Sequence, residues 1–423
     1  MSLMMTMTMA VVVVDGRRRG DCSGTQTSRA GSGTSGAGAV TYAPGDVIDI
    51  YPQNHLEDTL AALKQLGLHP DDVVEIKLNP DAPGFLRKNA EPLLPPRLTV
   101  LELFRVYLDV FGTPGRYFFE VLSHFATDPM QKEKLKEFNS PEGQLELYRY
   151  ATREKRTYIE VLADFRSAQL PLSHFISHVP RMQPRQFSIA SSCLKYPNQA
   201  HICMAVVEYK TPFRREKRGI CSSWLASLLA DSGGHQVPVS FSKGSFRMPS
   251  SLSTPVLMVG PGTGIAPFMS MCQEREVLLT RLASKNGIES TKDYGGAYVF
   301  FGNRFRDKDY LYREEWKLLT DGRTENGTKL AAVTGFYCAF SRDQKEKVYV
   351  QHRLAEQKDI VWDVLGKRNG TFMLAGNSQK MPNDVRKQVQ EIVRAIGKMS
   401  EREAKMFLLR MDAKRQYVQE TWS

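Results

Sequence analysis

The residues with the clearest chemical potential lie in a glycine-rich run at 255–271, with the sequence PVLMVGPGTGIAPFMSM. Apolar residues of strand length lead into Gly260-Pro261-Gly262-Thr263-Gly264, and helix-compatible residues follow, which predicts a strand, a tight turn and a helix start. Glycines let the backbone approach a ligand, and unpaired N–H groups at a helix start attract phosphate. The spacing G-x-G-x-G differs from the dinucleotide fingerprint G-x-G-x-x-G, so the pattern fits either a phosphate site or a simple turn.

A second group of residues that could bind an anion lies between 341 and 351. Ser341, Arg342 and Lys347 provide a hydroxyl group and two cations within seven residues, and Tyr349 and Gln351 follow on one alternating face. A nucleotide with an extra 2′-phosphate requires this kind of charge, whereas sites for the unphosphorylated nucleotide usually place an acidic residue there. A solvated basic loop has the same composition, so the segment alone leaves both interpretations open.

The composition indicates a globular protein with a basic surface. The chain has 423 residues, of which 42% are hydrophobic and 10% aromatic, so we expect two or three soluble domains. The formal net charge of +11 favours anionic partners such as phosphorylated cofactors or an acidic protein surface. No nucleic-acid-binding motif accompanies this charge, and we expect no nucleic-acid partner.

The cysteines and the apolar segments bear on the cellular compartment. The six cysteines form no C-x-x-C pair and have no regular spacing, which argues against a disulfide framework or structural zinc. We therefore expect a cytoplasmic protein without a metal site. No run of 18 apolar residues occurs, so no membrane span is expected. The apolar start of the chain precedes the arginines at 17–19, which is the wrong order for a secretory signal.

The first half of the chain is expected to be largely helical. Residues 1–40 are rich in Met, Ser, Thr and Gly and are predicted to be disordered. Folded sequence begins near Tyr42, and residues 47–51 predict a strand that ends at Pro52. From about 57 to 166, apolar residues repeat at intervals of three and four, which predicts a layer of helices.

Strands return after Pro180, at RQFSIASS, HICMAVVEY and VPVSFSKGSFRMP, with a basic turn at 213–218 before the helical sequence GICSSWLASLL. Short apolar strands then alternate with helices: VLMVG, a helix to about Lys285, AYVFFG, a helix through DYLYREEWKLL, KLAAVTGF, TFMLAG and a helix over NDVRKQVQEIVRAIG. Such alternation predicts a parallel sheet with ligands at the carboxyl ends of its strands. We expect an antiparallel β domain at 41–250, interrupted by a helical insertion at about 57–175, and an α/β nucleotide-binding domain at 251–423.

Seven motifs, in order along the chain, resemble one known family. They are RQFS at 185–188, GICS at 219–222, GPGTGIAPF at 260–268, FFGNRFRDKDYLYREEW at 300–316, SRDQKEKVYVQHRL at 341–354, LAGNSQKMPNDV at 374–385 and the terminal ETWS. Together they resemble the ferredoxin–NADP reductase-like half of the diflavin reductases, and within that family the NADPH-dependent diflavin oxidoreductases, the cytosolic branch that serves iron–sulfur protein assembly. The resemblance covers about 42–423. It implies an antiparallel FAD-binding barrel with a helical connecting insertion, followed by a parallel-sheet NADP-binding domain.

The resemblance implies that two of these motifs bind FAD. Arg185 would bridge pyrophosphate oxygens, and Phe187 would lie against the flavin ring. The Ser188 hydroxyl group would form a hydrogen bond near the reactive nitrogen of the flavin. Backbone N–H groups at the helix start at 219–222 would receive the pyrophosphate. A buried strand with an edge arginine and an ordinary capped helix are the alternatives. The expected FAD-binding residues are Arg185, Gln186, Phe187, Ser188, Gly219, Ile220, Cys221 and Ser222, and Cys221 is assigned no redox role.

The resemblance also implies an NADPH site. The sequence KVYVQH stands between two α/β units and matches the family's 2′-phosphate and adenine site, which favours nucleotide binding over a solvated loop. The expected NADPH-binding residues are Thr263, Ser341, Arg342, Lys347, Val348, Tyr349, Val350, Gln351 and Asp384.

The carboxyl-terminal residues are expected to act in the reaction. Trp422 matches the tryptophan that in this family stacks on the flavin ring and moves aside for the nicotinamide, and exposure of an indole to solvent would leave roughly 150–250 Å² of surface unburied. A helix-capping packing contact is the alternative. Glu420 stands where relatives carry aspartate near the hydride path, and Ala375 replaces a cysteine beside the nicotinamide, so no thiol is given a catalytic role. The expected catalytic residues are Ser188, Glu420 and Trp422.

The resemblance is incomplete at the amino-terminal side. The FMN module of the family and the barrel strands before Tyr42 are not found, so we expect a fragment, a splice form or an incomplete gene model. The expected activity is oxidation of NADPH by FAD, and in the full-length family the electrons pass through FMN to an iron–sulfur acceptor. A reductase for haem proteins, which would share every motif, and a non-catalytic product that binds a partner or a flavin remain as alternatives.

Overall fold

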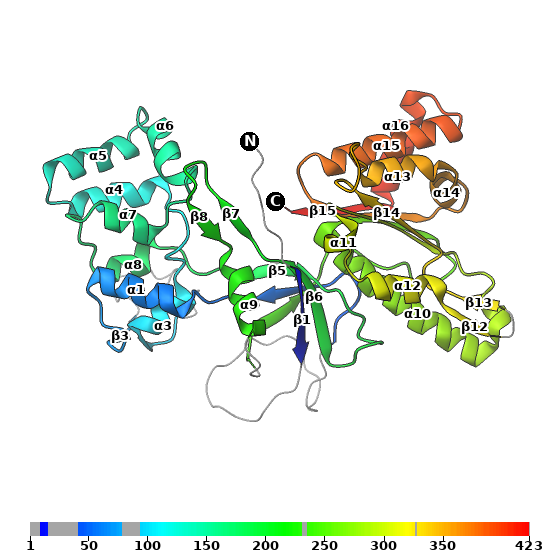
Figure 1. Cartoon of the computed structure of the whole chain (residues 1–423), viewed down its shortest axis with the longest axis horizontal. Coiled ribbons are helices and arrows are strands. Elements are labelled where there is room, and N and C mark those ends of the chain that lie inside the picture. Colours follow the sequence, from blue (N-terminus) through cyan, green and yellow to red (C-terminus); the bar gives the residue numbers. More distant parts are fainter. Residues whose placement is uncertain (1–8, 16–40, 78–93, 231–234, 326–327, 423) are drawn as a thin grey trace, which may run out of the picture. The chain divides into compact units, whose positions relative to one another are not determined.

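A computed structural model describes residues 9–15, 41–77, 94–230, 235–325 and 328–422 (Figure 1). The chain divides into two compact units whose segments interleave along the sequence. The first contains Met1–Ala10, Ile50–Arg185 and Ala205–Val239, and the second contains Val11–Asp49, Gln186–Met204 and Ser240–Ser423. The functional domain boundaries expected from the sequence stay a prediction.

The first unit is mainly helical. Its elements are α1 (Leu56–Leu66), β3 (Val73–Glu75), β4 (Arg97–Thr99), α3 (Val100–Glu102), η1 (Leu103–Tyr107), α4 (Arg116–Phe125), α5 (Pro129–Asn139), α6 (Gln144–Leu147), η2 (Tyr148–Thr152), α7 (Tyr158–Asp164), α8 (Leu172–His178), β7 (Glu208–Lys210), β8 (Glu216–Arg218) and α9 (Ile220–Ala230). The helices predicted from the three-and-four repeat are confirmed, and Phe104, Phe119 and Phe138 pack in their common core. The antiparallel pair β3–β4 was not predicted and follows from the β-branched residues Val73 and Val74.

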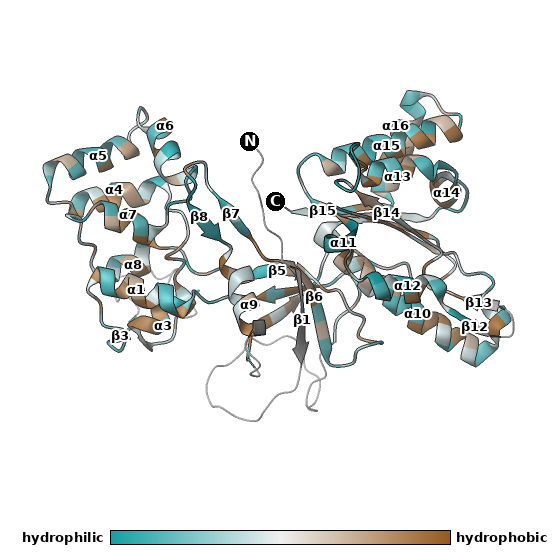
Figure 2. Ribbon diagram, viewed as in Figure 1, coloured by the Kyte–Doolittle hydropathy of each residue, from teal (hydrophilic) through white to brown (hydrophobic). Residues whose placement is uncertain are grey.

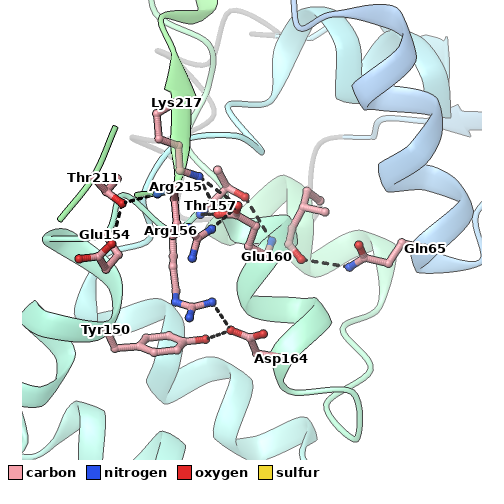
Figure 3. Close-up of polar contacts among 11 residues, drawn as sticks. Gln65, Tyr150, Glu154, Arg156, Thr157, Glu160, Asp164, Thr211, Arg215 and Lys217 are labelled. Carbon is pink, nitrogen blue, oxygen red and sulfur yellow. Dashed lines mark hydrogen bonds and ion pairs between the residues drawn. The ribbon is translucent and has the colours of Figure 1, made fainter. Parts of the chain in front are cut away.

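Ion pairs hold the antiparallel hairpin β7–β8 to the start of α7 (Figure 3). The Lys217 ammonium group donates to both carboxylate oxygens of Glu160, at 3.0 and 2.9 Å, and Arg215 pairs with the same carboxylate. Glu160 also accepts the Thr157 N–H group at 2.8 Å, which closes a capping box on α7. One carboxylate therefore stabilises a helix start and fixes a hairpin that lies more than fifty residues further along the chain.

The charge state of Glu160 follows from these contacts. Burial alone would raise the pKa of Glu160, but the hydrogen bonds from Lys217 and Thr157 and the positive charges of Lys217 and Arg215 outweigh it. The pKa of Glu160 consequently lies below its ordinary value, and the carboxylate is ionised at neutral pH.

The second unit contains a parallel sheet. Its elements are β2 (Val47–Ile50), β5 (Arg185–Ser188), β6 (Gln199–Ala205), β9 (Val239–Ser242), β10 (Val256–Pro261), η3 (Gly262–Ile265), α10 (Ala266–Asn286), η4 (Ile288–Thr291), β11 (Ala297–Asn303), α11 (Arg306–Asp309), α12 (Arg313–Asp321), β12 (Arg323–Glu325), β13 (Thr328–Leu330), β14 (Gly335–Phe340), α13 (Val350–Glu356), α14 (Lys358–Trp362), η5 (Asp363–Lys367), β15 (Thr371–Asn377), α15 (Met381–Ile396), α16 (Glu401–Ala413) and β16 (Tyr417–Trp422). In the described part of the chain, five strands pair in parallel in the order β14-β11-β10-β15-β16.

Alternation along the strands places the two cores of this unit on opposite faces of the sheet. Met258 faces α10, where it packs with Phe268 and Met269, whereas Leu257 packs with Val385 and Val389 of α15 on the other face. Figure 2 shows that α10 and α15 carry hydrophilic as well as hydrophobic residues, as expected for helices that bury one side. Both faces of the sheet are covered, so ligands can reach the strands only at their ends.

The strands before residue 250 differ from the predicted barrel. Among the described residues, the strands outside the parallel sheet form separate small sheets, including β5-β2-β9 and β1-β6, and no closed barrel is present. β1 (Met9–Asp15) lies within the segment predicted to be disordered, and its four consecutive valines favour an extended backbone. The rest of 1–40 lies outside the described residues.

Two predicted elements of the α/β region are wrong in their extent. The helix predicted through DYLYREEWKLL is broken, because Tyr310 stacks on Phe301 and Phe336 and Tyr312 takes a left-handed backbone (φ 56°) before α12 begins. KLAAVTGF is not one strand. Ala332 and Val333 are a buried connection, and the strand β14 begins only at Gly335.

Glu160→Gln tests the network that holds the hairpin. Glutamine keeps an acceptor for the Thr157 N–H group but removes the charge that pairs with Arg215 and Lys217, so we expect a loss of about 1 kcal/mol in the free energy of unfolding at pH 7. This value is discounted for solvent screening, since the Glu160 side chain is 36% exposed. Because the folded-state pKa is lowered, the loss should be present above about pH 4.3 and vanish as the pH falls through the folded pKa.

Urea unfolding of the full chain at pH 7 and near pH 3 measures this effect. Glu133→Gln is the matched control, because Glu133 pairs with Lys136 on an exposed helix surface and should contribute only a few tenths of a kcal/mol. A loss for Glu160→Gln that is equal at both pH values would mean that its charge has no role.

Candidate functional site

The predicted pyrophosphate-binding turn lies at the start of α9. A Cβ atom on Gly219 would lie 2.7 Å from the Ser222 hydroxyl oxygen and 3.0 Å from Val207 Cβ, so the turn has no room for a side chain there. The Ser222 hydroxyl group accepts the Val207 N–H group at 3.1 Å, which ties the helix start to the preceding chain. The N–H groups of the first turn of α9 are therefore presented by a fixed backbone, as an anion site requires.

The structure brings Arg185 close to this turn. Burial raises the pKa of Cys221 to about 12, and the positive charge of Arg185 partly offsets that rise. Burial also raises the pKa of Asp109, and the positive charge of Arg185 again partly offsets that rise. The Cys221 thiol therefore stays protonated near neutral pH.

A cavity of about 820 Å³ adjoins the turn within the first unit. It is lined by residues of α1, the start of α7, the hairpin β7–β8 and the start of α9, among them Tyr209, Lys217, Ile220 and Ser223. An aromatic ring beside a helix N-terminus suits a nucleotide, and the lining carries the carboxylates Asp58, Glu160, Glu208 and Glu216 as well as the cations Lys210, Lys217 and Arg218.

Two polar pairs lie along the wall of this cavity. His55 Nε2 lies 2.9 Å from the Ser223 hydroxyl oxygen, and Arg218 forms an ion pair with Asp58. Burial and the positive charge of Arg218 lower the pKa of His55, so the imidazole is neutral at pH 7. The sequence did not predict this cavity, because its walls come from distant segments. One of these segments contains the basic turn at 213–218, which the sequence does show.

The remaining residues of the RQFS motif lie on β5. Gln186 donates from Nε2 to the Asp49 carboxylate at 2.9 Å, and Phe187 and Ser188 are partly exposed. The predicted strand is confirmed. The flavin contacts assigned to Phe187 and Ser188 stay a prediction.

The glycine-rich turn after β10 forms the predicted strand, turn and helix start. A Cβ atom on Gly264 would lie 2.2 Å from the carbonyl oxygen of Ala375, and one on Gly260 would lie 2.7 Å from the carbonyl oxygen of Gly264. Gly262 has φ +59°, a backbone conformation that side chains disfavour. Thr263 thus sits in a turn of 3-10 form whose backbone packs directly against the end of β15.

The carboxyl-terminal strand brings two predicted catalytic positions to the same edge. In the parallel pairing of β15 and β16, Ala375 lies opposite Glu420 and Asn377 lies opposite Trp422. Glu420 accepts the Ser245 N–H group at 3.3 Å, and the Trp422 side chain is 37% exposed. A carboxylate and a partly exposed indole therefore stand at the carboxyl end of the sheet, beside the glycine turn. The strand β16 itself was not predicted.

The predicted 2′-phosphate residues follow β14 at the same end of the sheet. The Ser341 N–H group donates to the Asn303 carbonyl at 2.9 Å, and the Arg342 N–H group donates to the Arg304 carbonyl at 2.9 Å. Arg342 and Lys347 are exposed. The loop is thus fixed at its start, and its cations face solvent.

The alternating face predicted for Tyr349 and Gln351 is wrong. Tyr349 is extended and 43% exposed, but α13 begins at Val350, so Gln351 lies in the first turn of a helix. Val350 is only 3% exposed and packs in the core, so only its backbone could contact a ligand. Val348 is partly buried. Asp384 is exposed in the first turn of α15.

The described residues contain neither a cluster of metal-ligating side chains nor a membrane-spanning helix. No cluster of three or more His, Cys, Asp or Glu side chains could hold a metal ion there. Across 9–15, 41–77, 94–230, 235–325 and 328–422, no helix has both the length and the apolar character needed to span a bilayer.

Comparison with known proteins agrees with this division of sites. Residues 32–224 match the family described as FAD binding domain, and residues 258–387 match the family described as oxidoreductase NAD-binding domain. The first range includes the turn at the start of α9, and the second includes the glycine turn and the basic loop.

Full-length relatives extend the comparison. The chain is 38% identical to NADPH-dependent diflavin oxidoreductase 1 of Dictyostelium discoideum, over 84% of this chain and 54% of that protein. It is 38% identical to the Xenopus laevis protein of the same name, over 91% of this chain and 60% of that protein. It is 33% identical to NADPH–cytochrome P450 reductase of Musca domestica, over 91% of this chain and 54% of that protein.

The chain spans a little over half the length of these relatives. The two matched domains lie in the same order as the two groups of predicted anion-binding residues. The resemblance seen in the sequence motifs is confirmed, because the chain carries an FAD-binding and an NAD-binding domain and is 38% identical to two NADPH-dependent diflavin oxidoreductases over 84–91% of its length.

Proposed function

We propose that this protein oxidises NADPH with FAD as its bound flavin and passes the electrons to a protein acceptor. The observation that carries the proposal is the convergence at the carboxyl end of the parallel sheet, where the glycine turn, Glu420 and Trp422 accompany the basic loop. Bound FAD supplies the ring that takes hydride from the nicotinamide and releases electrons singly.

The first unit would hold the phosphate part of FAD. Arg185 would neutralise the pyrophosphate, and the N–H groups at the start of α9 would donate to its oxygens. The adjoining cavity would take the adenosine end, with Tyr209 as a surface for the base. The fixed glycine backbone at 219 and the nearby charge of Arg185 make the start of α9 suitable for this group, while Lys217 and Arg218 of β8 are paired with Glu160 and Asp58.

The second unit would orient the nicotinamide nucleotide. The turn around Thr263 would receive the nucleotide pyrophosphate, while Ser341, Arg342 and Lys347 would bind the 2′-phosphate. Trp422 would cover the flavin face until the nicotinamide displaces it. Glu420, held by the Ser245 N–H group, would keep a carboxylate at the place of hydride transfer.

The acceptor is proposed from the family. An iron–sulfur protein of cytosolic cluster assembly fits the diflavin oxidoreductase branch, with FMN as the intermediate carrier in the full-length proteins. A haem-protein acceptor is the second candidate, because the P450 reductase of Musca domestica is 33% identical over the same range. A cytoplasmic location fits the cysteines, since the described Cys193, Cys203, Cys221, Cys272 and Cys338 form no disulfide bond.

The purified protein should carry or take up FAD rather than FMN, because the paired phosphate features at 185 and 219–222 suit a pyrophosphate. Arg185→Ala should weaken FAD retention by at least about tenfold, since a charge-assisted hydrogen bond contributes about 1.5–3 kcal/mol. Heat release followed by chromatography identifies the flavin, and titration of the apoprotein measures affinity. Lys405→Ala, at an exposed site on α16, is the control. FMN as the sole flavin would contradict the proposal.

NADPH should bind more tightly than NADH, and Arg342 and Lys347 should carry the difference. Replacing both with alanine should weaken NADPH binding by several kcal/mol at most, because each charge-assisted hydrogen bond contributes about 1.5–3 kcal/mol, while NADH binding should barely change. Calorimetric titration of both nucleotides tests this, with the double variant Lys358→Ala/Lys367→Ala, which also removes two exposed cations, as the charge-matched control. Equal losses for both nucleotides would place the 2′-phosphate elsewhere.

Removal of residues 422–423, of which Ser423 lies outside the described residues, should tighten nicotinamide binding. Trp422 would no longer compete for the flavin face, and NADH should gain relatively more because it has no 2′-phosphate anchor. Turnover should fall, since the stacked product leaves slowly. Dissociation constants and the rate of flavin reduction in the truncated and intact chains measure these effects. An unchanged NADH affinity would make Trp422 a packing residue only.

A further inference from the structure

The loop proposed to bind the 2′-phosphate contains acidic residues among its cations. Between 341 and 347 the sequence SRDQKEK has three cations and two carboxylates, which leaves a net charge of 3 − 2 = +1. Asp343 directly follows Arg342, so its carboxylate stands next to a side chain assigned to the phosphate. An uncompensated carboxylate at that place would oppose a dianionic ligand.

A residue from a separate segment meets this carboxylate. The N–H group of Arg306, at the start of α11, donates to both carboxylate oxygens of Asp343, at 3.2 and 3.3 Å. The Arg306 Nε atom also lies 4.0 Å from Asp343 Oδ2. Arg306 therefore supplies the carboxylate with a hydrogen bond from its backbone and a positive charge from its side chain.

The Arg306 side chain is held in place by an aromatic ring. Its guanidinium carbon lies 4.9 Å from the ring centroid of Phe340, the last residue of β14, and Phe340 is only 3% exposed. A guanidinium group on an aromatic face is attracted by the ring and loses little freedom when it pairs with a carboxylate. The charge is thus fixed at the point where the loop leaves the sheet.

The contacts of Arg306 complete the attachment of the loop to the end of β11. Ser341 and Arg342 are bound through their N–H groups to the carbonyls of Asn303 and Arg304, and Asp343 is bound to Arg306. Three successive loop residues are therefore anchored to the segment 303–306. Beyond Asp343 the loop continues to Lys347 as an exposed stretch.

We infer that Arg306 is a positioning residue that determines specificity for the 2′-phosphate, because it neutralises Asp343 and fixes Arg342 at the nucleotide site. With Arg306 counted, the net charge of the loop and its anchor rises from +1 to +2. Arg306 acts through the loop and does not touch the phosphate. This inference rests on the proposed NADPH specificity and adds a residue that no motif of the basic loop contains.

The test compares two ligands that differ only in the phosphate, 2′,5′-ADP and 5′-AMP, by calorimetric titration of the full chain. Arg306→Ala should weaken 2′,5′-ADP binding by roughly threefold to tenfold, the range of a partly screened charge, and should leave 5′-AMP within about twofold. The loss should shrink in 0.5 M salt, because screening reduces interactions between exposed charges. Lys308→Ala removes the same charge from the same short helix and should change neither ligand.

A double-mutant cycle with Asp343→Asn separates neutralisation from direct contact. Asparagine keeps an acceptor for the Arg306 N–H group but removes the negative charge. In the Asp343→Asn background, Arg306→Ala should weaken the binding of 2′,5′-ADP by less than about twofold. A full loss in the Asp343→Asn background would show that Arg306 touches the phosphate and would overturn the inference.

The proposed NADPH specificity and the role of Arg306 are contradicted by different results. If the unaltered protein binds 2′,5′-ADP and 5′-AMP equally, the proposed NADPH specificity is wrong. If the unaltered protein discriminates between them and Arg306→Ala discriminates equally well, only the role of Arg306 is wrong. If Arg306→Ala weakens the binding of both ligands equally, Arg306 only stabilises the fold and its proposed role in specificity is wrong.

Discussion

The nucleotide-binding half of the protein depends on a contact between two backbones. Gly264 approaches the end of β15 so closely that a Cβ atom would lie 2.2 Å from the Ala375 carbonyl oxygen. No side-chain packing could replace this contact, because nothing larger than hydrogen fits there. Since Ala375 lies opposite Glu420 in the sheet, the same contact fixes the distance between the glycine turn and the carboxylate of the last strand.

In the first, helical unit, charged side chains position the walls of the cavity. Glu160 joins the start of α7 to β8, and Asp58 of α1 pairs with Arg218 at the end of the same strand. Each of these pairs is partly exposed and contributes little by itself, but together they fix two walls of the cavity beside α9. The flavin-binding side is therefore expected to be more sensitive to salt than the nucleotide side, whose geometry rests on backbone contacts.

Local patterns predicted the elements well where packing agreed with them. The strand, turn and helix at 255–271 and the strand at 185–188 follow from apolar runs and glycines, and the structure has both. The helix predicted through Tyr312 is broken because aromatic stacking of Tyr310 outweighs helix propensity. The strand β16 was not predicted, because two helices, α15 and α16, separate it in the sequence from its partner β15.

The site was predicted only where one segment carries several of its residues. Arg342 and Lys347 are close in sequence and could be recognised together. The cavity of the first unit and the pairing of Arg306 with Asp343 join segments that are far apart, and no local pattern reports such a meeting. Ion pairs between distant segments have no periodicity, so a single sequence cannot reveal them.

The interleaving of the two units has a consequence for the order in which the chain can fold. β2 and β5 are neighbours in one sheet, and the hydrogen bond between Gln186 and Asp49 spans 137 residues. Closing that stretch as a flexible loop would cost about 4 kcal/mol in chain entropy. The helical insertion contains mostly local contacts, so it can fold early and bring its own ends together. β2 would then stay an unpaired strand until the insertion has formed, and during synthesis it would be open to wrong pairing or to binding by chaperones.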